Sequence, residues 1–225
     1  ILPSEKAFEK NGIEGFIFHK PKDVVAGDFY WIERHDQYLF FAVADCTGHG
    51  VPGAILSMIC ANALNRATDI MKITDTGEVL DAVRDMIIKR LGKGEGDDKM
   101  SEGMDISLCR LNMETLELQY SGANNPIYIL SEEVEDILIA RPCKQPVGRF
   151  VKQTPFKSSI YQLKEKSMVY LFTDGFADQF GGVNGKKYKY KPFQRVIKQT
   201  SNVAMRNQKM AFNEELRKWM RDYEQ

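Results

Sequence analysis

The sequence predicts an α+β fold in which two antiparallel sheets form a sandwich with helices on the outside. Three features lead to this prediction. Short strand-like runs open the chain, two helical stretches follow, and more short runs precede a last helix, so strands and helices do not alternate one by one. That order disfavours a doubly wound parallel sheet. The 225 residues, 43% of them hydrophobic, are expected to form one domain over 1–225 that buries its core without staples such as disulfides.

The first elements are three predicted strands. Residues 14–19, 29–33 and 38–45 are rich in aromatic and β-branched side chains and are separated by turn-forming residues. The third run is apolar on both faces, which is typical of a central strand that is buried on both sides.

Two helices are predicted next. Apolar residues cover most of the helix circumference over 51–67, among them Ile55 and Met58, so this helix should pack on a sheet. A second, amphipathic helix is predicted over about 78–91, with Asp75 and Glu78 as its capping box and Gly92 at its end.

The second half begins with a polar, glycine-rich run at 92–99, which predicts a mobile loop. A final helix is predicted over about 202–220, with Phe212, Leu216 and Trp219 on one face. Between the loop and this helix, short strand-like runs separated by turns predict an antiparallel meander, over 104–111, 116–121, 127–130, 137–140, 156–162 and 168–172.

Charge and cysteine content exclude several classes of function. The 31 basic residues balance the 31 acidic ones, so no overall field attracts nucleic acid or an anionic membrane. No signal peptide or membrane-spanning stretch is visible, and we expect a cytoplasmic protein. Zinc-site spacing is absent from the cysteines, and Cys60 and Cys109 lie in apolar runs typical of reduced core residues; the full set is Cys46, Cys60, Cys109 and Cys143.

Acidic residues at the edges of apolar strands are the candidate chemical groups. Asp28 opens one strand, Asp45 closes the central strand and Asp174 closes a later one, each close to a glycine. A carboxylate in such a place is costly to desolvate unless it is paired or bound to a metal. Converging carboxylates without histidine or thiolate ligands favour Mg²⁺ or Mn²⁺ over zinc. The alternative is that each aspartate forms only a turn or helix cap after a strand.

Six ordered motifs extend over nearly the whole chain, and together they resemble the SpoIIE-like branch of the metal-dependent PPM phosphatases, the protein phosphatase 2C superfamily. They are VAGDFYW at 25–31, ADCTGHGVPGA at 44–54, GMDIS at 103–107, GANNP at 122–126, QPVG at 145–148 and FTDGF at 172–176.

The resemblance implies a PPM-type β-sandwich with α/β/β/α layers and two Mn²⁺ or Mg²⁺ ions at one edge. It implies that Asp28 and Asp45 ligate the ions, that Asp45 bridges them, and that the Cys46 carbonyl and Asp174 complete the ligand set. Two such ions activate a water for attack on phosphorus, so no protein nucleophile is required. The implied substrate is phosphoserine or phosphothreonine in a regulatory protein such as an anti-sigma-factor antagonist.

Two sets of residues near these motifs have alternative roles. His49, in the glycine turn after Asp45, either protonates the leaving serine oxygen or only holds the turn. Glu102 and Asp105 fall close to where the superfamily holds a weaker third metal. We favour the alternative that both are solvated loop and strand-edge carboxylates.

The sequence also departs from the family pattern in two ways. The usual final strand with its Asp-Asp pair is not seen before Gln225, so we expect this segment to lack that strand. Either the sequence ends before the strand, or metal binding is compromised. The arginine that animal-type relatives use to hold phosphate is absent, and only Lys20 and Lys22 lie nearby. The rival hypotheses are a catalytically impaired module that binds a signalling partner, and a two-metal phosphodiesterase.

Partners and regulation are less well determined by the sequence. Residues 186–195 interleave basic and aromatic side chains, for which a solvated flap is favoured over docking of an acidic phosphoprotein, with single-stranded nucleic acid third. Relatives commonly follow a sensor domain, so we expect an upstream sensor, and a homodimer is one of the assemblies we consider. The helix over 51–67, directly attached to Asp45, is expected to couple partner binding or dimerisation to metal-site geometry.

Overall fold

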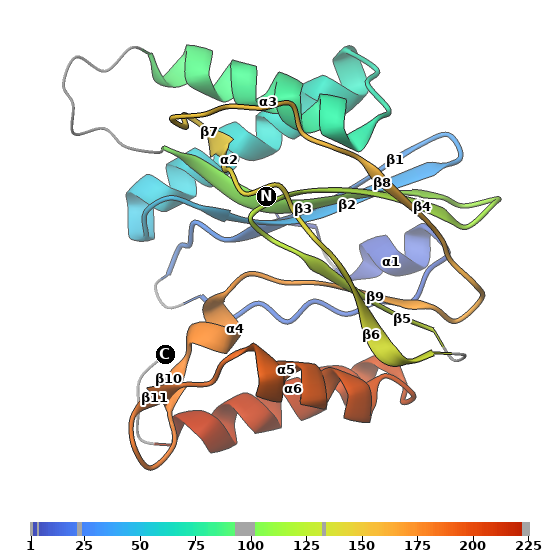
Figure 1. Cartoon of the computed structure of the whole chain (residues 1–225), viewed down its shortest axis with the longest axis vertical. Coiled ribbons are helices and arrows are strands. Elements are labelled where there is room, and N and C mark those ends of the chain that lie inside the picture. Colours follow the sequence, from blue (N-terminus) through green and yellow to red (C-terminus); the bar gives the residue numbers. More distant parts are fainter. Residues whose placement is uncertain (1, 4, 22–23, 93–101, 132–133, 222–225) are drawn as a thin grey trace.

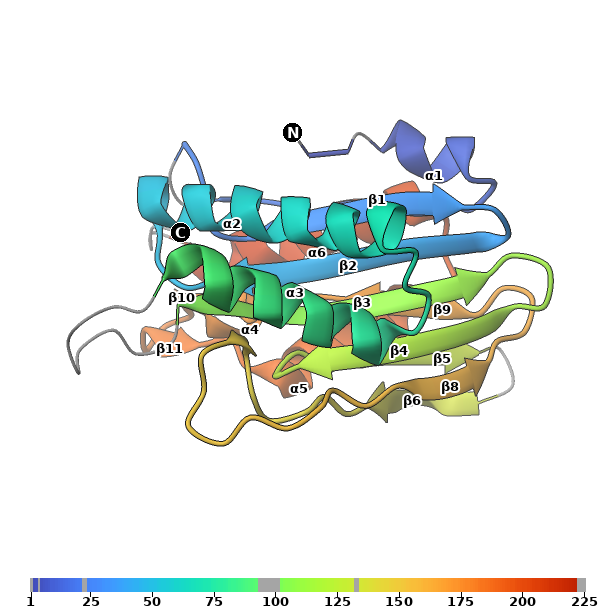
Figure 2. The same ribbon diagram turned by 90° about the horizontal axis from the view of Figure 1, so that it is seen from above.

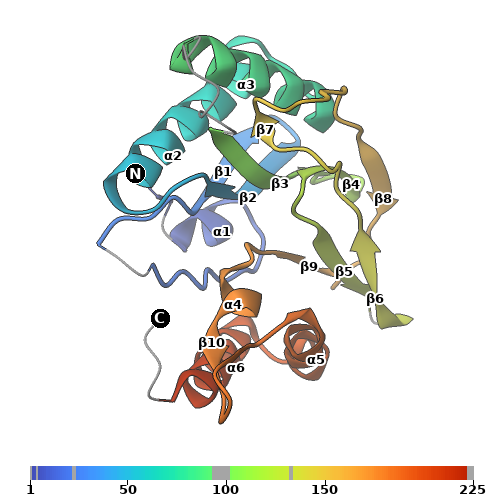
Figure 3. The same ribbon diagram turned by 60° about the vertical axis from the view of Figure 1, so that its left-hand side comes forward.

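The computed structural model describes residues 2–3, 5–21, 24–92, 102–131 and 134–221, and arranges them in four layers (Figure 1). Helices α2 (Gly50–Asn65) and α3 (Thr76–Leu91) cover one sheet, and α5 (Tyr190–Thr200) and α6 (Met205–Met220) cover the other. Figures 2 and 3 show the same layers from two further directions. The predicted α+β sandwich is confirmed.

The larger sheet has the strand order β1-β2-β3-β4-β8, with the short β7 (Val147–Gly148) also paired to β3. Every ladder in it is antiparallel. β2 pairs with a strand on each side, as a central strand should. Its face toward the helices is buried, with Phe40, Ala42 and Ala44, whereas Phe41 and Val43 on the other face are only half-buried, so the predicted burial on both faces is only partly met. The strands are β1 (Phe29–His35), β2 (Tyr38–Cys46), β3 (Gly103–Asn112), β4 (Glu117–Ala123) and β8 (Ser159–Gln162).

The smaller sheet has the order β6-β5-β9 and is also antiparallel. Its strands are β5 (Ile127–Ser131), β6 (Val134–Ala140) and β9 (Met168–Leu171). The later strands therefore return to both sheets instead of forming one meander, so the predicted connectivity was wrong although the strand positions were correct. A hairpin of β10 (Phe180–Gly181) and β11 (Lys186–Lys187) stands apart from both sheets.

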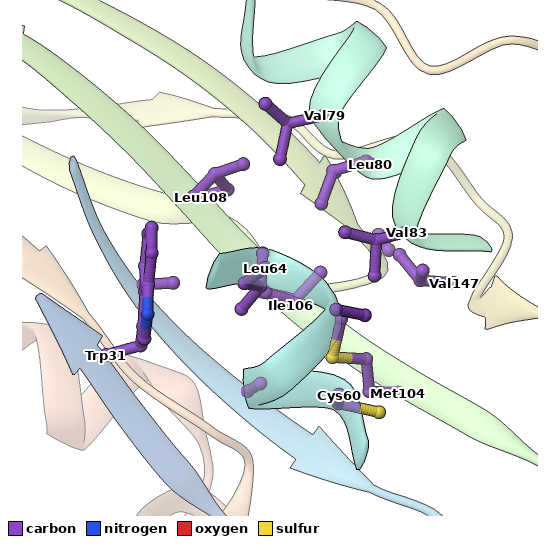
Figure 4. Close-up of a cluster of buried hydrophobic side chains, with 14 of the residues drawn as sticks. Trp31, Cys60, Leu64, Val79, Leu80, Val83, Met104, Ile106, Leu108 and Val147 are labelled. Atoms are coloured by element: carbon purple, nitrogen blue, oxygen red, sulfur yellow. The ribbon is translucent and has the colours of Figure 1, made fainter. Parts of the chain in front are cut away.

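Strand periodicity explains how one chain fills three apolar layers. Along β3, Met104, Ile106 and Leu108 face α2 and α3, whereas Cys109 and Leu111 face the second sheet. Alternate side chains point to opposite faces of a strand, so a run that is apolar at every position belongs between two layers. Figure 4 shows the first of these clusters, with Leu64 of α2 and Val83 of α3 packed against Ile106 and Leu108.

Helix α2 is less buried than the sequence predicted. Its sheet-facing side buries Gly53, Leu56, Cys60, Ala63 and Leu64, and a short π-helical turn η1 (Arg66–Ile70) follows. Ile55 and Met58 are 55% and 52% exposed, and Val51 is 64% exposed. A single sheet can cover only one side of a helix, so a helix that is apolar all round leaves one stripe in solvent.

Helix α3 begins where Asp75 caps it. The Asp75 carboxylate accepts the backbone N–H groups of Gly77 at 2.9 Å and Glu78 at 3.0 Å, and Gly92 ends the helix at a φ of 72°. The same carboxylate also accepts the Ser158 hydroxyl and the Gln119 amide. Asp75 therefore connects the helix start to β4 and to the segment leading into β8.

Replacing Asp75 with alanine is expected to lower the free energy of unfolding by roughly 2–3 kcal/mol, because a helix cap and two partly buried polar partners are lost together. Urea denaturation followed by circular dichroism measures this change. Asp85→Ala, an exchange on the same helix away from its start, serves as the control. A loss below about 0.5 kcal/mol would contradict the capping role.

Two predicted elements differ from the structure. Residues 14–19 form no strand and join no ladder. Phe16 and Phe18 pack instead on Phe212 of α6, with ring centroids 5.9 Å and 6.4 Å from that of Phe212. Residues 186–195 are not a solvated flap throughout. Tyr188 is buried and its ring packs against Phe176 and Trp219. Phe193 is buried against Tyr128 of the second sheet, as the helical spacing of the apolar residues in α5 explains.

Other features were either missed or fall outside the described residues. The short helices α1 (Lys6–Lys10) and α4 (Gly175–Asp178) were not predicted, nor was α5. Most of the predicted glycine-rich loop, and Lys22, lie outside the described residues. Cys60 and Cys109 are free and buried, as predicted. Within the described ranges, no helix is long and apolar enough to cross a bilayer.

Candidate functional site

Strand register brings three aspartates to one end of the larger sheet. Asp45 lies directly opposite Asp105, where β2 pairs with β3. Phe29 pairs with Ala44, so Asp28, one residue before β1, falls beside Asp45. Three neighbouring strands thus place Asp28, Asp45 and Asp105 in a row across their ends, which is called the aspartate row below.

Asp174 joins this row from the smaller sheet. β9 ends at Leu171, and the next residues lead toward β1, where the Thr173 hydroxyl donates a hydrogen bond to Asp28 Oδ2 at 2.8 Å. Asp174 follows immediately, as the N-cap residue directly before α4. This hydrogen bond connects the strand ends of the two sheets and holds Asp174 close to Asp28.

The carboxylates repel one another strongly. Burial first, and then the charge of Asp28 and its hydrogen bond, raise the pKa of Asp45 to about 8, with smaller contributions from Asp174 and Asp105. Burial, together with the charges of Asp178 and Asp28, raises the pKa of Asp174. Like charges held this close together are unfavourable in the folded state, and a neighbouring positive charge would offset their repulsion.

The glycines of this region let backbone oxygens approach Asp28. A Cβ on Gly27 would lie 2.8 Å from the Cys46 carbonyl oxygen and 2.9 Å from that of Gly48, and one on Gly53 would clash with the Gly48 oxygen. Any side chain at these positions would displace the turn. The Cys46 carbonyl, expected as a ligand, therefore lies against the residue that precedes Asp28.

His49 is exposed in the turn between β2 and α2. Its backbone is extended, with φ −125° and ψ 169°, and its side chain does not cap the helix that follows. The imidazole therefore lies on the solvent side of the turn that joins Asp45 to α2. Proton donation to a leaving oxygen remains a prediction for this residue.

Asp105 is more closely involved than sequence reasoning favoured. It is half-buried opposite Asp45, burial raises its pKa, and the Asn124 amide donates a hydrogen bond to it at 2.8 Å. Glu102, just before β3, is exposed, as the solvated alternative predicted. Asn124 and Thr173 were missed as supporting residues, although both lie in motifs that the sequence showed.

The donor set fits a hard divalent cation. All four side chains present carboxylate oxygens, and their mutual repulsion would be relieved by positive charge. In the described part of the chain, no three Asp, Glu, His or Cys side chains already converge on one ion-sized position. Asp28 and Asp45 are in contact, whereas Asp105 and Asp174 act on Asp45 through their charge.

Comparison with solved structures supports the fold. The SiaA-PP2C domain of Pseudomonas aeruginosa matches with a TM-score of 0.83 and 25% identity, over 93% of this chain and 80% of that one. The RsbU and RsbW domains of a Mycobacterium tuberculosis protein match with a TM-score of 0.67 and 19% identity, over 87% of this chain and 52% of that one. RsbX in complex with magnesium matches with a TM-score of 0.62 and 15% identity, over 92% of this chain and 87% of that one.

Sequence comparison supplies the family. No curated protein sequence matches the chain. The family model for Stage II sporulation protein E (SpoIIE) matches residues 35–224, which is most of the chain and includes Asp45, Asp105 and Asp174. The fold is that of PP2C-type phosphatase domains. The chain therefore belongs to the SpoIIE family of phosphatase domains.

Proposed function

We propose that this domain hydrolyses phosphoserine or phosphothreonine in a regulatory partner protein, with two Mn²⁺ or Mg²⁺ ions at the aspartate row. The observation that carries the proposal is the strand register that aligns Asp28, Asp45 and Asp105, with Thr173 bringing Asp174 to them. The magnesium complex of RsbX, which shares the fold, supports the choice of ion. When bound, the ions supply an activated water and neutralise charge during in-line displacement at phosphorus.

The chain's own residues have separate tasks in this proposal. Asp28, Asp45, the Cys46 carbonyl and Asp174 hold the ions, and the Thr173 hydroxyl fixes the orientation of the Asp28 carboxylate. His49, on the solvent side of the turn, gives a proton to the serine or threonine oxygen as it leaves. Asp105, held by Asn124, adds negative charge beside Asp45 and supports a weaker third ion.

A regulatory phosphoprotein is the proposed substrate. Among the matched structures, one combines RsbU and RsbW domains, which is consistent with a partner-switching system. The exposed stripe of Val51, Ile55 and Met58 on α2 begins directly after Gly50, the last residue of the glycine turn. We infer that a partner or a second copy covers this stripe and thereby acts on the turn that carries His49.

The test is release of p-nitrophenol from p-nitrophenyl phosphate by the full chain. Turnover is expected only with Mn²⁺ or Mg²⁺, is expected to stop on chelation, and is expected to return when metal is restored. Bis(p-nitrophenyl) phosphate, a diester, is expected to react far more slowly, which separates a phosphatase from a phosphodiesterase. Metal-independent turnover would contradict the mechanism.

A catalytically impaired binding module is the second candidate. It is favoured by the lack of three converging ligand side chains among the described residues. It predicts neither Mn²⁺ binding in calorimetry nor turnover in the full chain. Mn²⁺ binding with turnover would exclude it.

A further inference from the structure

We propose that Lys187, on the β10–β11 hairpin, binds the phosphoryl group of the substrate and positions it over the aspartate row. This inference rests on the proposed phosphatase function and adds a phosphate-binding residue to it. The sequence offered no arginine for this task, and Lys187 comes from the opposite end of the chain to Lys20 and Lys22.

The hairpin is fixed beside Asp174 by its backbone. Asp178, the last residue of α4, donates its N–H to the Asp174 carbonyl at 2.8 Å. The residues after Lys187 are bonded to the same short helix, since Tyr188 N–H donates to the Gln179 carbonyl and Lys189 N–H donates to the Ala177 carbonyl. Lys187 therefore has a defined place next to the helix that follows Asp174.

The other side of the hairpin is anchored on α6. Gly182 N–H donates to the Trp219 carbonyl at 2.7 Å, and the Trp219 indole donates to the Gln179 carbonyl at 2.9 Å. A Cβ on Gly181 would clash with the same Trp219 oxygen, so the strand packs tightly on the helix. Figures 1 and 3 show β10 beside α4 and α6. A hairpin held in this way can present a side chain with defined geometry.

Charge indicates the role of Lys187. Its ammonium lies 2.6 Å from Asp178 Oδ2, and Asp178 lies one helix turn after Asp174. Both partners are partly exposed, at 46% and 43% of their side-chain surface. Exposed ion pairs add little stability, so Lys187 can exchange Asp178 for a stronger acceptor at low cost. A phosphate dianion is such an acceptor, and lysine is a common phosphate ligand.

Lys186 provides a matched control. It neighbours Lys187 on the same two-residue strand and is also exposed, but successive strand residues point to opposite sides. Lys186→Met and Lys187→Met therefore each remove one positive charge from the hairpin, but from opposite sides of it. Lys187→Arg keeps the charge, and Asp178→Asn removes the competing carboxylate.

The experiment measures kcat and KM for a phosphoserine peptide, and inhibition by inorganic phosphate, in the Mn²⁺-loaded full chain. Lys187→Met is expected to raise KM and the phosphate inhibition constant about 10-fold or more, with kcat changed less, because one charged hydrogen bond is lost. Lys187→Arg should restore most of the loss. Asp178→Asn should shift both constants in the opposite direction, and Lys186→Met should leave them unchanged.

The possible results separate the two proposals. If the wild-type chain turns over but Lys187→Met leaves KM and phosphate inhibition unchanged, the role of Lys187 is overturned and the phosphatase function stands. If the wild-type chain shows no turnover, the function fails, and calorimetric binding of O-phosphoserine with Mn²⁺ decides the role of Lys187. Equal binding by wild type and Lys187→Met, or binding by neither, would then overturn it.

Discussion

Replacing Asp45 with asparagine is expected to lower metal-dependent kcat/KM by about 10³-fold or more, since a ligand lost from a two-metal site removes several kcal/mol of transition-state stabilisation. Asp45 lies between Asp28 and Asp105 in the strand register, at the centre of the aspartate row. Asparagine keeps the size of the side chain and removes its charge, so the loss reports on metal binding and not on packing.

Asp36→Asn is the matched control for this exchange. Asp36 lies in the turn between β1 and β2 at a φ of 52°, a conformation that asparagine adopts as readily as aspartate. The same chemical change there is expected to leave turnover within about twofold of wild type, as for most exposed sites. Steady-state kinetics at several Mn²⁺ concentrations measures both variants. Activity of Asp45→Asn within tenfold of wild type at saturating Mn²⁺ would contradict the assigned role.

Most elements could be predicted from local sequence, because hydrophobic periodicity and turn residues act over short distances. The strand over 38–45, the helix that ends at Gly92 and the final helix with Phe212 and Leu216 were found in this way. Residues 14–19 carry the same kind of pattern but form no ladder. Pairing with a neighbouring strand is decided by tertiary contacts, here with Phe212, and a local pattern cannot contain that information.

The candidate site shows the same division between local and long-range information. Asp28, Asp45 and Asp174 could be selected because each is an acidic residue at the edge of an apolar strand. Asp105 was placed with solvated carboxylates, since its position opposite Asp45 depends on the register of two strands that are far apart in sequence. Thr173 was given no role for a similar reason, because its partner Asp28 is 145 residues away.

The fate of residues 186–195 illustrates a different limit. Lysines and aromatic residues in alternation resemble a solvated binding segment, yet Tyr188 and Phe193 are buried and Lys187 forms an ion pair with Asp178. Composition alone does not distinguish the two, since the direction of each side chain depends on where the hairpin ends and α5 begins. The helical spacing of Phe193, Val196 and Ile197 was the signal that could have found the helix.

The metal-free domain is expected to lose stability as the pH rises from about 4 to 8. The pKa of Asp45 is raised to about 8 by burial and by the charge of Asp28, above its value near 4 in an unfolded chain. Below pH 4, Asp45 is protonated in both states and does not penalise folding. Between pH 4 and 8 it ionises only on unfolding, so the free energy of unfolding falls until the pH passes the folded-state pKa. Burial raises the pKa values of Asp105 and Asp174 as well, and these groups act in the same direction.

Asp45→Asn isolates this contribution, because the variant keeps every other titrating group. At pH 8 without metal, the free energy of unfolding of the variant is expected to exceed that of wild type by roughly 1–2 kcal/mol. This range allows for solvent screening of a half-buried group. At pH 4 the two proteins should be nearly equal. Urea denaturation across this pH range measures the difference, and a constant difference at all pH values would contradict the electrostatic origin.

Manganese is expected to reverse the order of the two proteins. Bound Mn²⁺ stabilises wild type by about 2.7 kcal/mol at a concentration 100 times its Kd, whereas Asp45→Asn lacks the ligand and gains little. The variant should therefore be the more stable protein in chelator and the less stable one in Mn²⁺ at pH 8. Stabilisation of both proteins to the same extent would mean that Mn²⁺ binds elsewhere. The row of aspartates would then be a costly arrangement of charge without the cation that accounts for it.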